Sequence, residues 1–174
     1  MRAQDIVIAL KIQSLQDCTA GIPCRYSQRQ LAVDTGVSLA QVNAACRRLE
    51  GAGLLAPGRR RVVGAALLEF LVHGLKYVFP LVTGEISRGM PTGYAAEPLR
   101  DEYLSSKDEL VPVWPDPEGT VRGIAVQPIH KTVPLAARKD KRLYQYLALV
   151  DALRGGRARE RDRAIEILTK WLEQ

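Results

Sequence analysis

The chain has 174 residues, of which 47% are hydrophobic, and its formal net charge is +6 at pH 7. This length suits one domain of ordinary size or a small domain with an appendage, and the hydrophobic content is sufficient for a packed core. No apolar run approaches the length that crosses a bilayer, which argues against a membrane-spanning helix.

Residues 1–16 predict an amphipathic helix rather than a signal peptide. An acidic residue, Asp5, precedes the apolar positions, and Lys11 and Gln13 interrupt them. We therefore expect a cytoplasmic protein whose first helix packs against the segment that follows.

The most informative pattern, at residues 27–55, consists of two short helical segments joined by a tight turn. Gly36 stands where the chain must bend, because glycine adopts a left-handed backbone at least cost. Val37 fills the angle between the helices, and Ser38 is a suitable N-cap for the second helix. Apolar residues then recur on the buried side of that helix: Val42, Ala45 and Leu49. These features predict a helix-turn-helix.

This segment resembles the DNA-reading half of bacterial winged-helix regulators of the MarR and GntR type. The resemblance rests on the order LA, three residues, GVS, two residues, QV, and then RRLE and GLL, and it covers roughly the first third of the chain. It implies a recognition helix at residues 38–50 and a β-hairpin wing at residues 55–63. The strand at 54–56 would lead through Pro57-Gly58 into a return strand at 61–63.

We expect the recognition helix to enter the major groove and the wing to contact phosphates or the minor groove. The candidate DNA-binding residues carry hydroxyl, amide or guanidinium groups, with one small apolar residue among them: Ser27, Gln28, Ser38, Gln41, Asn43, Ala44, Arg47, Arg48, Arg59, Arg60 and Arg61. A helix-turn-helix can also serve only as a scaffold for packing or dimerisation. The arginines of the wing and of the recognition helix favour DNA binding over that alternative.

The basic residues are unevenly distributed along the chain. Residues 1–64 hold nine Lys and Arg against four Asp and Glu, residues 65–135 hold six against nine, and residues 136–174 hold ten against six. The first of these basic segments coincides with the predicted DNA-binding segment. Binding to DNA requires such basic residues, because they neutralise phosphates and release the counterions bound there. Towards the C-terminus both signs of charge alternate, which favours a solvated helix surface.

Residues 64–79 predict a helix that is apolar on nearly all sides. Such a helix is expected to be buried, either between the DNA-binding segment and the rest or between two subunits. It is also the leading candidate for the dimer interface that the resemblance to winged-helix regulators implies. We expect His73 to lie in a core or an interface rather than to act as a ligand or a base.

Residues 80–134 hold eight of the ten prolines and show little periodicity. Residues 88–92 are interpreted as an ordered turn. Residues 110–126 predict a β-hairpin whose turn is at 116–119. We expect Trp114 to pack against this small sheet rather than to hold a ligand.

Two further helices are predicted towards the C-terminus. The first carries an apolar stripe and ends at Gly155-Gly156: Leu143, Tyr146, Leu147, Val150 and Leu153. The second, at residues 157–174, has apolar residues at the same spacing: Ala164, Ile165, Leu168, Trp171 and Leu172. These helices would cover the middle of the chain or form a dimer seam.

No sequence motif indicates an enzyme, a cofactor or a metal site. The chain has no Gly-rich phosphate loop, no nucleophile elbow and no H-E-x-x-H. Cys18, Cys24 and Cys46 lack metal-ligand spacing, so buried or incidental thiols are expected, with a reversible Cys18–Cys24 disulfide as an alternative. We therefore expect no catalysis, no cofactor and no metal.

The sequence thus predicts a mainly α-helical (α+β) protein. It comprises a winged helix-turn-helix at residues 1–63 and an α+β appendage at residues 64–174, with a small β-hairpin and two terminal helices. The expected function is sequence-specific binding of double-stranded DNA by a homodimeric repressor on an inverted-repeat operator. One alternative is the antitoxin or autorepressor of a two-gene module, whose appendage binds a partner protein. Another is a sensor that holds a small-molecule effector among four aromatic residues: Phe70, Tyr77, Tyr94 and Trp114.

Overall fold

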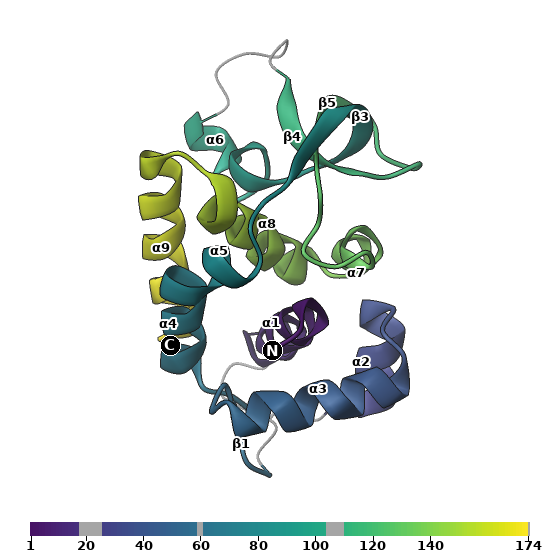
Figure 1. Ribbon diagram of the computed structural model, residues 1–174, viewed down its shortest axis with the longest axis vertical. Helices are drawn as coiled ribbons and strands as arrows, with labels where there is room; N and C mark the ends of the chain where they lie inside the picture. Colours follow the sequence, from purple (N-terminus) through teal and green to yellow (C-terminus); the bar gives the residue numbers. More distant parts are fainter. Residues whose placement is uncertain (18–25, 59–60, 104–109, 174) are drawn as a thin grey trace.

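The computed structural model describes residues 1–17, 26–58, 61–103 and 110–173. The protein is mainly helical with two small β-sheets, which confirms the predicted α+β class. The helix-turn-helix lies at one end of the molecule and a three-stranded sheet at the other, with helices α1 (Ala3–Asp17) and α8 (Lys141–Gly155) between them (Figure 1). Within the described ranges, no helix has both the length and the apolar character needed to cross a bilayer.

The helix-turn-helix forms as the sequence predicts. Helix α2 (Gln28–Thr35) ends at Gly36, whose φ of 68° is left-handed and whose N–H donates to the Ala32 carbonyl. Helix α3 (Leu39–Gly51) begins after Ser38, whose Oγ accepts from the Gln41 N–H at 3.4 Å. The turn glycine and the N-cap serine therefore set the angle between the two helices, as their backbone preferences require.

The short wing is also confirmed. Strands β1 (Leu55–Ala56) and β2 (Arg61–Val62) pair antiparallel, with Leu55 opposite Val62. Gly58 takes the left-handed backbone of the turn, with φ of 61°. The Val62 N–H donates to the Gln16 side chain, which attaches the wing to α1.

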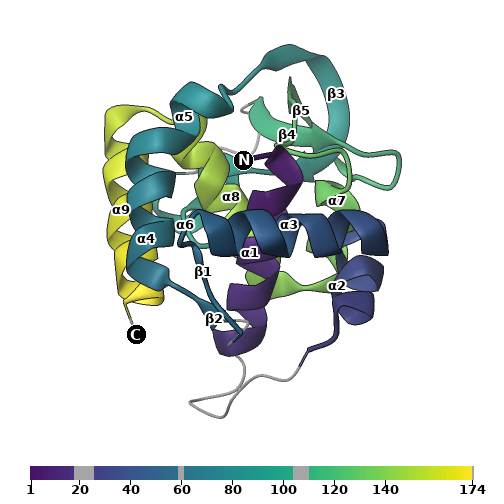
Figure 2. The ribbon, with the colours of Figure 1, turned by 60° about the horizontal axis from the view of Figure 1, so that its bottom comes forward.

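Helix α1 is buried on all sides, so the prediction of an amphipathic helix is wrong. A continuous run of its side chains, at positions 4–14, is buried. Helices α2 and α3 pack on one side of α1 and α8 packs on the other, and α3 crosses it directly (Figure 2). The periodicity is weak because no side of this helix faces water.

A buried cation of α1 joins this helix to two others. Lys11 Nζ lies 2.7 Å from Asp140 Oδ2 at the start of α8 and 3.2 Å from Asp34 Oδ2 on α2. Asp140 also caps α8 by accepting the Leu143 N–H at 3.0 Å. Burial would raise the pKa of Asp140, but the hydrogen bonds from Lys11, Leu143 and Ser14 outweigh it and lower that pKa.

The predicted helix over 64–79 forms in three parts. Helix α4 (Gly64–Glu69) continues through a π-helical turn, η1 (Phe70–Gly74), into α5 (Leu75–Val78). One side carries buried Leu67, Leu71 and Leu75 and packs against α8 and α9 (Ala158–Leu172). His73 and Tyr77 are exposed on the other side, so this helix is not buried all round within one chain and His73 is not in its core, while burial between two subunits stays a prediction.

The sheet differs most from its prediction. Strands β3 (Thr83–Pro91), β4 (Val111–Pro115) and β5 (Val121–Val126) form a small closed barrel. The predicted β4–β5 hairpin is wrong, because these strands run parallel and β3 is the antiparallel partner of both. The predicted turn at 88–92 is also wrong, since these residues lie mostly within β3.

Glycines allow this barrel to close. A Cβ on Gly89 would lie 1.9 Å from the Trp114 carbonyl oxygen, and one on Gly123 would lie 2.0 Å from the Val111 carbonyl oxygen. These contacts are too close for any side chain. The strands therefore cross at positions where only glycine fits.

Short helices connect the barrel to the rest: η2 (Gly93–Ala95), α6 (Arg100–Tyr103) and α7 (Val133–Lys139). The predicted C-terminal helices α8 and α9 are confirmed, with the break at Gly155-Gly156. Helix α7 packs on α2, where Lys139 Nζ donates to the Val33 carbonyl at 2.7 Å. The largest apolar cluster of the described residues includes members of both predicted segments, 1–63 and 64–174.

We expect Gly89→Ala to destabilise the protein. Its Cβ would lie 1.9 Å from a backbone oxygen, so two strands would have to separate. Overpacking costs about 1–3 kcal/mol of unfolding free energy, and the rigid backbone contact places this case at the upper end. Chemical denaturation followed by circular dichroism measures the loss. Gly84→Ala is the matched control on the same strand, because its Cβ would meet Ala125 at an ordinary 3.5 Å. An equal loss in both variants would contradict the steric argument.

The lowered pKa of Asp140 predicts a pH-dependent stability. A carboxyl whose folded-state pKa lies below its usual 3.8 stabilises the protein above that pH, and this contribution disappears as the pH falls through the folded-state pKa. We expect Asp140→Asn to lower the unfolding free energy by about 1–3 kcal/mol at neutral pH. The difference from wild type should shrink below pH 3.8.

Urea denaturation over an acid-to-neutral pH series measures this difference. Asp162→Asn removes an exposed carboxylate on α9 and serves as the control, for which we expect almost no difference at any pH. If the loss of unfolding free energy in Asp140→Asn is the same at every pH, then the stabilisation by the helix cap and the ion pair of residue 140 does not depend on the charge of Asp140.

Candidate nucleic-acid interface

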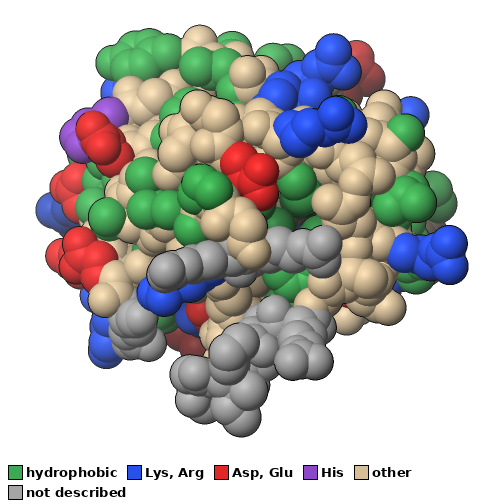
Figure 3. Space-filling view, turned by 90° about the horizontal axis from the view of Figure 1, so that it is seen from below, with side chains coloured by type: hydrophobic (Ala, Val, Ile, Leu, Met, Phe, Trp, Pro, Cys, Tyr) green, Lys and Arg blue, Asp and Glu red, His purple; other side chains and the backbone are tan. Residues whose placement is uncertain are grey.

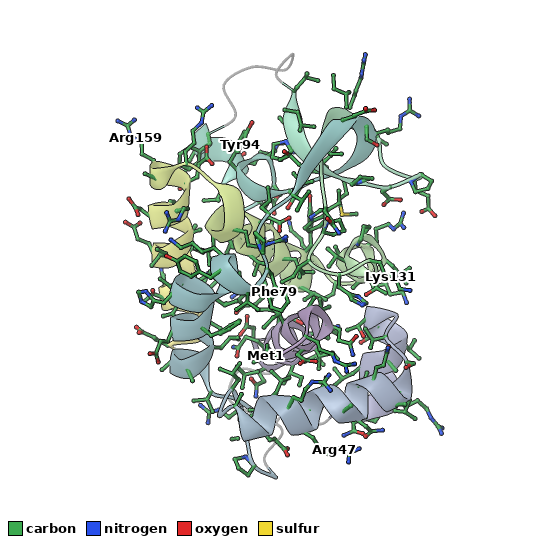
Figure 4. All side chains as sticks on the ribbon, viewed as in Figure 1. Met1, Arg47, Phe79, Tyr94, Lys131 and Arg159 are labelled. Atoms are coloured by element: carbon green, nitrogen blue, oxygen red, sulfur yellow. The ribbon has the colours of Figure 1, made fainter. Side chains whose placement is uncertain are left out.

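The outer side of α3 is accessible at one end of the molecule. Val42, Ala45, Cys46 and Leu49 face the core, as predicted for the buried side. Gln41 and Arg47 are exposed, and Asn43 and Ala44 are half-buried. Figure 4 shows Arg47 on the side of α3 that faces away from the rest of the protein. The exposed surface of α3 therefore offers amide, guanidinium and methyl groups, which can contact base edges.

Arg48, although predicted to contact DNA, is held by an internal ion pair. Its Nε and Nη2 donate to the two carboxylate oxygens of Asp5 at 2.9 and 2.7 Å, a bidentate arrangement. Asp5 is fully buried, and its hydrogen bonds to Arg48 raise the pKa of that guanidinium. The structure therefore assigns Arg48 to the packing of α3 on α1, and Arg47 remains as the exposed arginine of this helix.

Ser27 and Ser38 each cap a helix and remain exposed. Ser27 Oγ accepts from the Gln30 N–H at 3.0 Å, as Ser38 Oγ does from Gln41. A capping hydroxyl accepts in this role, so its own O–H stays available as a donor. Together with half-buried Gln28, these residues are suited to phosphate contacts at the N-terminal ends of α2 and α3.

The described part of the wing carries one arginine, Arg61, beside α3. Arg61 is exposed and lies opposite Ala56 in the hairpin. Arg59 and Arg60, predicted at the wing tip, lie outside the described residues, as do Cys18 and Cys24.

The structure adds residues that the sequence reasoning missed. Leu39 is 41% exposed at the start of α3, where an apolar side chain can contact a thymine methyl group. Arg29 is exposed on α2. Lys131 is exposed too, and Figure 4 shows it on the side of the molecule where α2 and α7 meet. Its neighbour Thr132 packs against Gly36 of the turn. Helical spacing identifies positions such as Arg29, whereas nothing local in the sequence places Lys131 beside the helix-turn-helix.

The charge on this face is discontinuous. Figure 3 views the α3 end of the molecule and shows Lys and Arg side chains at separate places, with acidic side chains among them. The described part of this face neutralises few phosphates, so its contribution to non-specific affinity for DNA should be modest. Recognition would then depend on contacts to bases more than on bulk charge.

A cavity of about 190 Å³ lies between the barrel and helices α8 and α9. Tyr94 lines it, but the other aromatic residues of the predicted effector site do not gather there. Tyr77 is 76% exposed on α5, and Trp114 is buried with its Nε1 donating to Asp151 Oδ2 at 2.6 Å. The four aromatic residues therefore do not form one pocket. Trp114 is buried, but its indole packs edge-on against the Tyr144 ring of α8, so it packs against that helix rather than against the sheet as expected. Within the described ranges, no cluster of His, Cys, Asp and Glu is arranged to hold a metal ion.

Comparisons with protein-family models, with curated proteins and with solved structures found no match.

Replacing each of the two adjacent arginines on α3 by alanine should have different effects on the stability of the protein. Arg48→Ala leaves the buried carboxylate of Asp5 with too few donors, so we expect a loss of about 2–3 kcal/mol of unfolding free energy. Arg47→Ala removes an exposed side chain and should change stability by less than about 0.5 kcal/mol. Urea denaturation of both variants at neutral pH tests this difference. Equal stabilities would mean that the Arg48–Asp5 pair adds nothing.

Proposed function

We propose that this protein is a sequence-specific DNA-binding transcriptional regulator. The observation that supports the proposal best is the exposed outer side of α3, with Gln41 and Arg47 accessible, beside a wing that carries Arg61. A helix that served only for packing within the chain would bury this side against another element, whereas here it faces outward at one end of the molecule (Figure 1).

The side chains that are accessible to DNA form two groups, one suited to bases and the other suited to phosphates. Arg47, Gln41 and Asn43 carry groups that pair with base edges in the major groove, while Ala44 and Leu39 offer methyl groups for thymine. Ser27, Ser38 and Arg61 are suited to phosphates, which fix the position of the protein on the duplex. Arg48 is not expected to contribute directly, because its guanidinium already binds Asp5.

The proposed regulator acts as a homodimeric repressor. One chain presents one recognition helix, so two copies related by two-fold symmetry would read an inverted repeat whose half-sites lie about one helical turn, or a multiple of it, apart. The DNA upstream of the protein's own gene is the first candidate operator, because autoregulation is common to both the repressor and the antitoxin interpretations.

Fluorescence anisotropy with that upstream DNA and a scrambled duplex, over a salt series, tests the proposal. We expect tighter binding to the upstream DNA. Arg47→Ala should remove about 1–3 kcal/mol of this preference, whereas Arg61→Ala should weaken binding to both duplexes and reduce the salt slope by about one.

Arg159→Ala is the matched control. It removes the same charge from an exposed position at the other end of the molecule, as Figure 4 shows by the separation of Arg159 from Arg47. This variant should bind both duplexes almost as wild type does. Weak binding that is equal on both duplexes and unaffected by Arg47→Ala would contradict the proposal.

A further inference from the structure

Two arginines of the barrel face each other directly. Arg88 on β3 and Arg122 on β5 are cross-strand partners, and both are exposed. Like charges opposite each other destabilise an antiparallel pair. Within the described residues neither arginine takes part in an ion pair, and the acidic residues after β4, Asp116 and Glu118, bind Arg138 instead. The pair therefore weakens the barrel and is suited to hold an anionic group.

Apolar side chains lie next to this arginine pair on the same side of the sheet. Ile86 and Ile124 are also direct cross-strand partners, 49% and 39% exposed, two positions from Arg88 and Arg122. Alternate residues of a strand point to the same side, so the two pairs form adjacent rows. Leu110, just before β4, is 42% exposed.

The isoleucine row leads into the cavity between the barrel and the C-terminal helices. Ile124 and Leu110 line this cavity of about 190 Å³, together with Leu81 and Tyr94. Arg157 lies at its α9 side and is exposed.

The result, called the groove below, is an exposed apolar row that leads into this cavity, with basic residues at its margins. Asp151 and Glu160 also line the cavity, but both are buried and their carboxylates already accept hydrogen bonds within the chain.

We propose that this groove binds an acidic, amphipathic segment of a partner protein. An apolar side chain of the segment would fill the cavity, and its carboxylates would form bidentate hydrogen bonds with Arg88 and Arg122. Binding would replace the repulsion between the two arginines by two charge-assisted pairs. The proposal goes beyond DNA binding and does not depend on it.

A protein segment fits this groove better than a nucleic acid does. Exposed isoleucine and leucine gain by packing against apolar side chains, whereas single-stranded bases stack on aromatic residues. The barrel also lies at the opposite end of the molecule from α3, so a straight duplex on α3 does not reach it (Figure 1).

Selection from a displayed library of random peptides tests the proposal with the full chain as the target. We expect enriched peptides to combine Asp or Glu with Leu, Ile or Phe. The best one, synthesised with a fluorescent label, should bind the wild type with an affinity that falls as salt increases.

The double variant Arg88→Gln, Arg122→Gln should bind this peptide roughly tenfold less tightly or worse. Its thermal midpoint should equal or exceed that of the wild type, because the like-charge repulsion is gone; a purely structural role would lower it. Arg29→Gln, at the helix-turn-helix end, should bind the peptide as wild type does.

Several results would overturn the proposal. These are selection of peptides without acidic residues, no enrichment over the double variant, or peptide binding that the double substitution leaves unchanged. A non-operator duplex or single strand whose affinity falls in the double variant would assign the groove to nucleic acid. Self-association in sedimentation experiments that the double variant abolishes would assign it to a second copy of this chain.

Discussion

Helix α1 has no side exposed to water, and helices α2, α3 and α8 and strand β2 pack around it. Ile6, Ile8 and Leu10 are fully buried, and burial of each contributes about 1.5–3 kcal/mol to folding. Its charged residues pair with the surrounding helices: Asp5 with α3, Lys11 with α2 and the start of α8, and Asp17 with α8. A buried ion pair adds little net stability, but the loss of one partner is costly. These pairs therefore fix how α1 lies relative to its neighbours.

This arrangement shapes the face that we propose binds DNA. Because α1 contacts both α3 and α8, the winged helix-turn-helix shares one apolar core with the C-terminal helices. The predicted boundary near residue 63 therefore separates two sequence segments that pack together in one apolar core. The same arrangement decides which arginine reads DNA in our proposal: Asp5 holds Arg48 against α1, and Arg47, one position earlier and about 100° around the helix, stays exposed.

The structure could be predicted wherever it is determined by residues that are close together in the sequence. Gly36, Ser38 and Gly155-Gly156 mark helix ends through their own backbone and side-chain chemistry, so the helix-turn-helix and the last helices could be predicted. The barrel could not, because β3 is defined by pairing with strands far along the chain and β4–β5 pair in parallel despite a short connection. The ion pair of Arg48 could not be predicted either, since its partner Asp5 lies 43 residues away in the sequence.

Helix α8 joins the two ends of the molecule. At its start, Asp140 binds Lys11 of α1, and about 16 Å further along, Asp151 accepts hydrogen bonds from Thr92 and Trp114 at the barrel. Every residue at positions 146–153 is buried, which makes this helix a rigid connection. A ligand changes a distant affinity by favouring one conformation of the protein over another, and the close packing of α8 at positions 146–153 leaves little room for a second arrangement. If α3 binds DNA as we propose, we therefore expect a partner in the groove to leave the affinity of α3 for DNA unchanged and to act through what it brings to the DNA.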